Sequence, residues 1–181
     1  MRFLKYLRKI FFGRYRRDML KEKIKCNHSA TFRCEQRLIL GEYIYIGPNC
    51  DINAVGGVSI GSGTILGPHV VILSSVHDYN IDCTLPYDKT DFIRPVTIGC
   101  GVWIGYGAKI CPGISIEDGA VIAMGSVVTK NIGKGEVVGG NPAKLLKHRK
   151  MTELEINQLV KDKKFFHKKY WQDCRPREFK D

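Results

Sequence analysis

Several features are missing from this chain of 181 residues, and each absence excludes a class of protein. The seven cysteines include no Cys-x-x-Cys pair, which argues against a disulfide framework or a structural zinc site and fits a reducing compartment. No apolar run approaches the ~20 residues that a membrane-spanning helix needs. The N-terminal stretch MRFLKYLRKIFFGRYRRDMLKEKIK is charged throughout and has no small-residue cleavage site, so we expect no secretory signal.

Acidic residues are too few at the two ends of the chain to balance the basic ones. Residues 1–25 carry a net charge of +8 and residues 144–181 a net charge of +6, whereas residues 26–143 carry −3. A nucleic-acid-binding protein would more often have a basic patch on its folded body, so we expect no nucleic-acid partner. We expect three parts: a basic amphipathic helix over 1–25, a central domain over 26–143, and a helical extension over 144–181.

The central domain contains a six-residue repeat of aliphatic side chains. One series keeps a step of six without interruption: Ile98, Ile104, Ile110, Ile116, Ile122 and Val128. Upstream, a series from Leu40 to Val58 and a series from Ile60 to Ile72 keep the same step, with a shift of two residues between them. The period matches neither a helix nor a flat strand and is typical of a hexapeptide parallel β-helix. We expect an all-β solenoid with coils at about 40–57, 60–77, 98–115 and 116–133.

The repeat is interrupted by an irregular polar loop over 78–97. His77 comes directly before this loop, and strand alternation predicts that it points outward while Val76 points into the core. An outward histidine beside an inserted loop is well placed to meet a ligand, and its pKa near neutrality suits proton transfer. The loop's aromatic and charged side chains, among them Asp78, Tyr79 and Arg94, suit the binding of a sugar.

Four stretches, in this order, carry a resemblance to a known family: SSVHDYN, PVTIGCGVWIGYGAKICPGISI, MGSVVTKNI and GGNPAKLLK. Over residues 40–149 the sequence resembles the hexapeptide-repeat acyltransferases, and especially their sugar O-acetyltransferases of the galactoside and maltose type. The resemblance implies a left-handed parallel β-helix, acetyl-CoA as the acyl donor, and a homotrimer with active sites between neighbouring subunits. The left hand comes from the family alone, because parallel crossovers are otherwise nearly always right-handed.

The resemblance also assigns roles to individual residues. His77 matches the catalytic histidine, and Asn53 resembles the asparagine that orients it from the preceding coil. The acetyl-CoA site would comprise Trp103, Gly105, Ala123, Met124, Gly125, Thr129, Lys130 and Lys147. Trp103 could instead pack against another subunit, and the two lysines could be ordinary solvated side chains.

The acceptor implied by the family is a sugar hydroxyl, free or on a lipid-linked oligosaccharide, during the synthesis of a surface polysaccharide such as O-antigen or capsule. Three alternatives stay open: N-acetylation of an amino sugar, N-acetylation of an antibiotic, or a non-catalytic β-helix trimer that acts as a scaffold. Zinc chemistry of the related β-helix carbonic anhydrases is not expected, because Asp82 stands where those enzymes have a second histidine. We expect no metal and no cysteine nucleophile.

The two ends are expected to be helical. Residues 1–25 have the profile of a basic interfacial helix, which would either contact a membrane peripherally or cap the first coil. We therefore expect a cytoplasmic protein, with the inner face of the membrane as a possible location. In the extension, Thr152 and Glu155 form a capping-box pattern that predicts the start of a helix covering the last coil.

Overall fold

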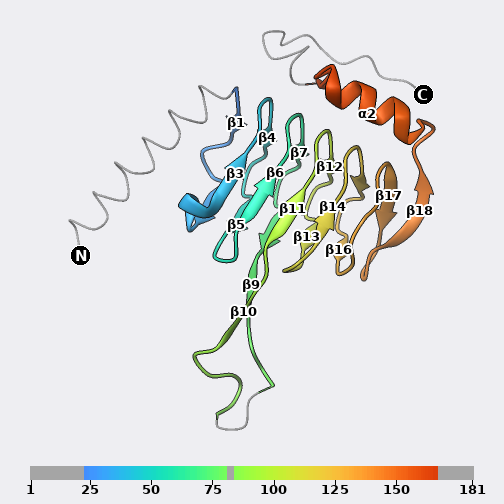
Figure 1. The fold of residues 1–181 in the computed structure, drawn as a ribbon. Helices are drawn as coiled ribbons and strands as arrows, with labels where there is room; N and C mark the ends of the chain where they lie inside the picture. The colour runs from blue at the N-terminus through green and yellow to red at the C-terminus, as the bar shows by residue number, and fades with distance from the viewer. Residues whose placement is uncertain (1–22, 81–83, 167–181) are drawn as a thin grey trace.

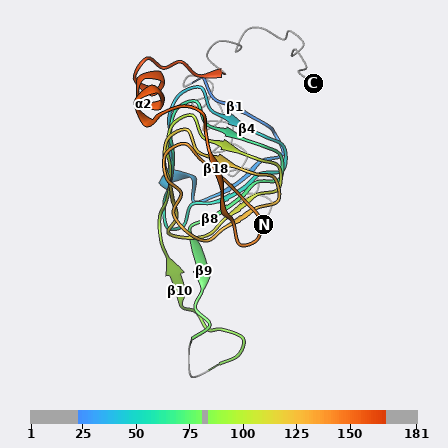
Figure 2. The ribbon, with the colours of Figure 1, turned by 90° about the vertical axis from the view of Figure 1, so that its right-hand side faces the viewer.

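The computed structural model describes residues 23–80 and 84–166, which wind into a prism of parallel β-strands with three sheets as its sides (Figure 1). Figure 2 looks nearly along the prism, so that successive coils superpose. The basic helix and membrane contact predicted for residues 1–25 fall almost wholly outside the described residues, as do residues 167–181. No helix in the described part is long and apolar enough to cross a membrane.

The strands are short, and each pairs with its counterparts in the coils before and after it. The first sheet contains β1 (Lys25–Cys26), β4 (Tyr45–Ile46), β7 (Ile65–Leu66), β12 (Trp103–Ile104), β15 (Val121–Ile122), β17 (Glu136–Gly139) and the antiparallel β18 (Lys144–His148). The second contains β2 (Thr31–Arg33), β5 (Asp51–Asn53), β8 (Val71–Leu73), β13 (Lys109–Ile110) and β16 (Val127–Val128). The third contains β3 (Leu38–Leu40), β6 (Val58–Ile60), β11 (Val96–Ile98) and β14 (Ser115–Ile116).

The core is a set of aliphatic columns, because each repeat places one large side chain inward and the parallel register stacks these side chains. One column runs through Ile46, Leu66, Ile104, Ile122 and Val138, all at most 1% exposed. The shift of two residues in the repeat falls within β6. There Val58 and Ile60 lie two residues apart on one face of the strand, and both point inward.

The solenoid has about six coils, more than the four that the repeat predicts. β1 and β2 form a coil ahead of Leu40, with Ile24 and Ala30 buried at 2% each. β17 adds a partial coil at the other end, filled by Val138. Both were missed because their buried residues do not continue the six-residue step of aliphatic side chains.

The chain leaves the prism at Ser74 and returns at Arg94, and the segment between them forms an arm. β9 (Ser75–His77) and β10 (Asp91–Ile93) pair as antiparallel strands and extend away from the prism (Figures 1 and 2). The base is closed because Arg94 N–H donates to the Ser74 carbonyl at 2.9 Å. The prediction that Val76 points into the core is wrong, since β9 has already left the prism and Val76 is 46% exposed.

The helix α2 (Glu153–Lys161) lies along the corner between the third and first sheets, which we call the glycine corner. Gly63, Gly101, Gly119 and Gly135 succeed one another along it, all with positive φ. Phe165 occupies the space that a side chain at Gly63 would need, and Ile156 does the same at Gly119 and Gly135. A short 3-10 helix, η1 (Glu35–Arg37), completes the described elements.

Candidate active site

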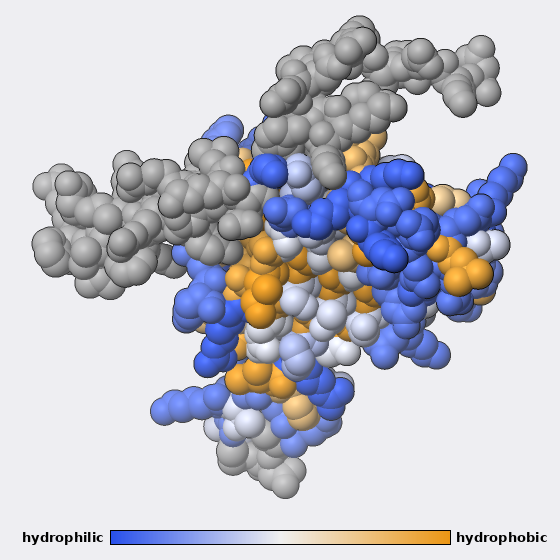
Figure 3. All heavy atoms as spheres, turned by 45° about the horizontal axis from the view of Figure 1, so that its top comes forward, coloured by the Kyte–Doolittle hydropathy of each residue, from blue (hydrophilic) through white to orange (hydrophobic). Residues whose placement is uncertain are grey.

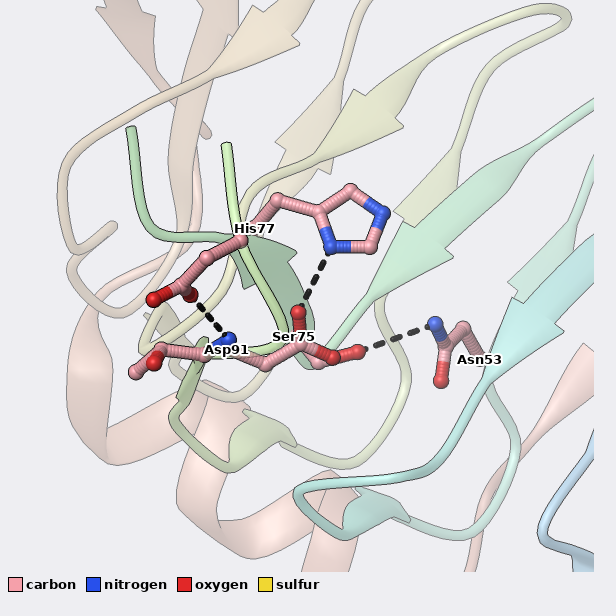
Figure 4. Close-up of polar contacts among 6 residues, drawn as sticks. Asn53, Ser75, His77 and Asp91 are labelled. Atoms are coloured by element: carbon pink, nitrogen blue, oxygen red, sulfur yellow. Dashed lines mark hydrogen bonds and ion pairs between the residues drawn. The ribbon is translucent and has the colours of Figure 1, made fainter. Parts of the chain in front are cut away.

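The arm holds His77 in place through a carboxylate on its opposite strand. The antiparallel register sets Asp91 directly across from His77, so both side chains lie on the same side of the two-stranded ribbon. His77 Nδ1 lies 2.7 Å from Asp91 Oδ1, and the other ring nitrogen points away from Asp91 (Figure 4). The His77 side chain is 55% exposed, so that nitrogen can be reached from solvent.

An aromatic ring fixes the plane of the imidazole. Tyr87 stacks on His77 with ring centroids 4.0 Å apart and an angle of 6° between the planes. Asp88 helps to shape the turn that carries Tyr87, since its Oδ1 accepts a hydrogen bond from Thr90 N–H. His77 is therefore held both at Nδ1 and across its face, although it lies on an element that projects from the body.

Asn53 lies at the base of the arm and contacts a different partner from the one expected. Its Nδ2 donates to Ser75 Oγ at 3.1 Å (Figure 4). Its Oδ1 accepts from Val55 N–H at 3.0 Å. The side chain is only 8% exposed. Asn53 thus orients the first residue of β9, whereas Asp91 contacts His77.

The expected acceptor-binding residues are spread along the arm. Asp78 Oδ1 accepts a hydrogen bond from Asn80 N–H at 2.8 Å, which forms a local turn. Tyr79 is 71% exposed. Arg94 lies at the base, where its side chain packs over Gly113. Asp78 and Tyr79 therefore accompany His77, whereas Arg94 belongs to the surface of the prism.

The small residues expected to bind acetyl-CoA gather at the corner between the first and second sheets. Ala123, Met124 and Gly125 form this corner in one coil, and Gly105 belongs to the preceding coil. A methyl group added at Gly105 would come within 2.6 Å of the Met124 backbone nitrogen, whereas no atom lies within 4 Å of the corresponding point at Gly125. The corner is therefore tightly packed between coils and open outward, with Met124 73% exposed beside it.

The remaining acetyl-CoA candidates lie elsewhere. Trp103 and Lys147 belong to the first sheet. Trp103 pairs with Val121, Val121 with Val137, and Val137 with Lys147, so the two residues lie in one row across the sheet. Trp103 is 54% exposed, which confirms that it faces outward. Thr129 and Lys130 follow β16, at the corner between the second and third sheets where the arm also departs. The expected site residues of one chain therefore lie on several sides of the prism.

Three of the described cysteines are poor candidates for a nucleophile. Burial raises the pKa of the Cys50, Cys100 and Cys111 thiols, which disfavours the reactive thiolate. Cys83 lies outside the described residues. Within residues 23–80 and 84–166, no group of three or more histidine, cysteine or acidic side chains could hold a metal ion.

Sequence reasoning placed Tyr87 and Asp91 in the loop but did not identify them as the partners of His77. The facing of His77 and Asp91 depends on the hairpin register, and the loop between the strands has no short turn signal that would fix it. The alternation of side chains along β9 could not show that the carboxylate of Asp91, thirteen residues after Asp78, lies beside His77.

Comparison with known proteins shows that the sequence is similar to those of transferases. Residues 95–130 match the family described as bacterial transferase hexapeptide (six repeats). The chain is 33% identical over 131 residues to a galactoside O-acetyltransferase of Escherichia coli, covering 72% of this chain and 59% of that protein. It is 40% identical over 116 residues to nodulation protein L of Rhizobium meliloti, covering 63% and 62% respectively. The chain spans about half to three fifths of the length of the curated relatives it matches.

Solved structures agree with the fold. A hexapeptide-repeat acetyltransferase of Vibrio cholerae, in complex with acetyl-CoA, superposes with a TM-score of 0.66 at 22% identity, covering 71% of this chain and 69% of that one. A galactoside acetyltransferase in complex with coenzyme A gives a TM-score of 0.50 at 26% identity, covering 73% and 70%. The expected fold class, a left-handed parallel β-helix with a C-terminal helix, is confirmed.

Proposed function

Because the chain belongs to the hexapeptide-repeat transferase family, we propose that it transfers an acetyl group from acetyl-CoA to a hydroxyl group of a sugar. The observation that carries this proposal is His77, held by Asp91 at 2.7 Å with its second ring nitrogen accessible. A sugar hydroxyl is a weak nucleophile, so attack on the donor requires a base that accepts its proton. The polysaccharide setting and a lipid-linked acceptor are part of the same proposal.

The chemistry follows from the two nitrogens of His77. Asp91 accepts a hydrogen bond from Nδ1–H, which leaves Nε2 as the base that takes the proton of the acceptor hydroxyl. As the imidazole becomes positively charged, the adjacent carboxylate stabilises it, as in other histidine–aspartate pairs. Acetyl-CoA supplies an acetyl group already activated as a thioester, and His77 Nε2 can return its proton to the departing sulfur.

The corner between the first and second sheets fits the pantetheine arm of coenzyme A. A methyl group at Gly105 would meet the next coil, whereas the outer side of Gly125 is open, so a thin chain can approach the backbone closely. Ala123, Met124 and Gly125 would line it, and Lys130 and Lys147 would meet phosphates. Met124 narrows this corner because its long side chain is 73% exposed there.

The positions of the expected site residues on different sides of the prism support assembly into a homotrimer. His77 extends from one corner of the prism, whereas Trp103 and Lys147 lie on the first sheet. A site that combines them needs the arm of one chain beside a face of another. The arm also exposes apolar side chains that a neighbour would cover, with Phe92 39% and Ile93 54% exposed.

The test is the release of free thiol from acetyl-CoA with a panel of sugars, lipid-linked oligosaccharides and amino sugars. We expect turnover with some hydroxyl acceptors, and a fall of about 10²–10⁴ in kcat for His77→Ala. Equal turnover in His77→Ala would remove His77 from the mechanism. Turnover with amine acceptors alone would replace O-acetylation by N-acetylation, and no binding of coenzyme A at all would favour a scaffold.

A further inference from the structure

A cavity of about 290 Å³ lies beneath α2 at the glycine corner. The segment that contains α2 is anchored at two points, where Ile156 packs against Gly119 and Phe165 occupies the space beside Gly63. Between these anchors, Leu159 and Val160 line the cavity and are only half-buried. The helix therefore bridges the corner and leaves a space beneath its middle.

The walls of this cavity are mostly apolar. Ile65 and Trp103 form the side that belongs to the first sheet, and Met151, Leu159 and Val160 contribute to the opposite side. No side-chain amide or hydroxyl occurs among the described residues that line it. Its volume is at the lower end of the ~300–1,000 Å³ that is usual for small-molecule sites. Because no amide, hydroxyl or carboxylate side chain among these lining residues is available to pair with a nucleobase or a sugar, the cavity suits a hydrocarbon chain.

The charged groups in this cavity are cationic. Arg149 and Lys164 line it, and none of the described lining residues is acidic. Arg149 Nε donates to the Gly119 carbonyl, and the guanidinium is half-buried. Lys164 has one partner on its own segment, Asp162, at 3.4 Å, and its side chain stays 65% exposed. A half-buried cation beside apolar walls is best satisfied by an anionic group.

We propose that the cavity under α2 binds the hydrocarbon chain of an anionic amphiphile, whose phosphate or carboxylate head lies against Arg149 and Lys164. Within one chain the cavity and His77 lie at different corners of the prism, because the arm departs between the second and third sheets whereas α2 lies along the glycine corner (Figures 1 and 2). Trp103, on the cavity wall, is shared with the proposed acetyl-CoA site. Figure 3 shows hydrophilic and apolar surface meeting on this side of the molecule. The proposal does not depend on acetyl transfer, and its test measures binding without acetyl-CoA.

Decyl phosphate, kept below the concentration at which it forms micelles, is the probe. The full chain has two tryptophans, so a Trp171→Phe variant leaves Trp103, on the cavity wall, as the only tryptophan fluorophore. We expect a saturable change in its emission with decyl phosphate. Decanol, which lacks the anion, and inorganic phosphate, which lacks the chain, should each bind at least about tenfold more weakly, equal to 1.4 kcal/mol or more.

Two variants and a control test the location in the same background. Val160→Phe fills the cavity and Arg149→Gln removes its buried cation, so each should weaken binding of decyl phosphate about tenfold or more. Leu154→Phe is the control, because Leu154 is on the same helix, 80% exposed, and does not line the cavity. The proposal is overturned if the change in Trp103 emission does not saturate with decyl phosphate, or if decanol binds with equal affinity. It is also overturned if uridine monophosphate binds more tightly than decyl phosphate, or if Val160→Phe binds decyl phosphate with wild-type affinity. A change of oligomeric state in Val160→Phe without any decyl phosphate binding would assign this face to a second copy instead.

Discussion

At the scale of single residues, the proposed chemistry depends on which nitrogen of His77 faces the acceptor. Asp91 settles this, because an ionised carboxylate 2.7 Å from Nδ1 favours the tautomer that carries the proton there. Tyr87 restricts rotation of the ring by stacking at 4.0 Å. The free nitrogen is thus oriented by the arm itself, without a contribution from the prism.

Replacing Asp91 by Asn should therefore lower kcat while KM for the acceptor stays nearly unchanged. The amide can still accept a hydrogen bond, but it carries no charge to stabilise the imidazolium. We expect a loss of about tenfold or more, smaller than the ~10²–10⁴ for His77→Ala, measured by thiol release at saturating acetyl-CoA. Asp88→Asn is the matched control on the same arm. A wild-type kcat in Asp91→Asn would show that His77 needs no carboxylate.

Two glycines at one corner should respond differently to alanine. At Gly105 a methyl group would come within 2.6 Å of the Met124 backbone nitrogen, so Gly105→Ala forces adjacent coils apart and should cost about 1–3 kcal/mol of unfolding free energy. Gly107 has open space around it, so only the backbone penalty of its φ of +67° opposes Gly107→Ala, which should cost about 1–2 kcal/mol. Urea unfolding of both variants measures the difference. A larger loss at Gly107 would contradict tight packing between the coils.

The inward residues could be predicted from sequence, whereas the partners of His77 could not. Ile104, Ile110 and Ile116 are buried at 1% or less because a six-residue step brings each to the inward side of the next sheet. Asp91 meets His77 through one antiparallel register, which depends on how the loop between them folds. No periodic signal in the loop specifies that register.

At the scale of elements, α2 is specified by its own sequence. Glu155 N–H donates to Thr152 Oγ1 at 3.3 Å, and Thr152 N–H donates to a Glu155 carboxylate oxygen at 2.7 Å. The capping-box pattern was therefore sufficient to predict where the helix begins. The arm has no comparable signal, which explains why Val76 was expected to be buried.

Removing the cap should loosen α2 without unfolding the prism. Thr152→Ala leaves an N-terminal N–H without its acceptor, and we expect it to cost the helix about 1 kcal/mol. Amide hydrogen exchange should quicken across Glu153–Lys161 while β12 and β15 keep their protection. Thr152→Ser, which retains the hydroxyl, is the control. Equal protection of α2 in Thr152→Ala would show that packing of Ile156 alone holds the helix.

The same cap predicts a dependence on pH. Hydrogen bonds from the Thr152 backbone and side chain lower the pKa of the Glu155 carboxyl. The pKa of Glu155 is therefore lower in the folded protein than in the unfolded one. The carboxylate stabilises α2 at pH values above the ordinary pKa range of glutamate, and this stabilisation is lost as the pH falls through the pKa of the folded state. Protection factors in α2, which are corrected for the intrinsic pH dependence of amide exchange, should therefore fall on acidification, and less so in Glu155→Gln. A Glu155→Gln variant with the same pH dependence would assign the effect to another group.

At the scale of the whole molecule, we propose that a neighbouring chain completes the site. The solenoid fixes its three sheets on separate faces, so His77 on the arm and Trp103 on the first sheet project from different sides. The repeat made the prism predictable, because every coil follows the same rule. How copies assemble depends on the surfaces of the arm and the outer faces, where no periodic rule applies.

Complementation between two inactive variants tests this arrangement. If one chain supplies His77 and its neighbour supplies Trp103, mixed trimers of His77→Ala and Trp103→Ala contain some sites with both residues intact. Unfolding and refolding the two variants together should then restore turnover that neither shows alone, and wild-type chains should elute at three times 20.5 kDa. Refolding each variant by itself is the control. A trimer that regains no activity on mixing would place both residues in a site built by one chain, and a monomer with full activity would remove the need for a neighbour.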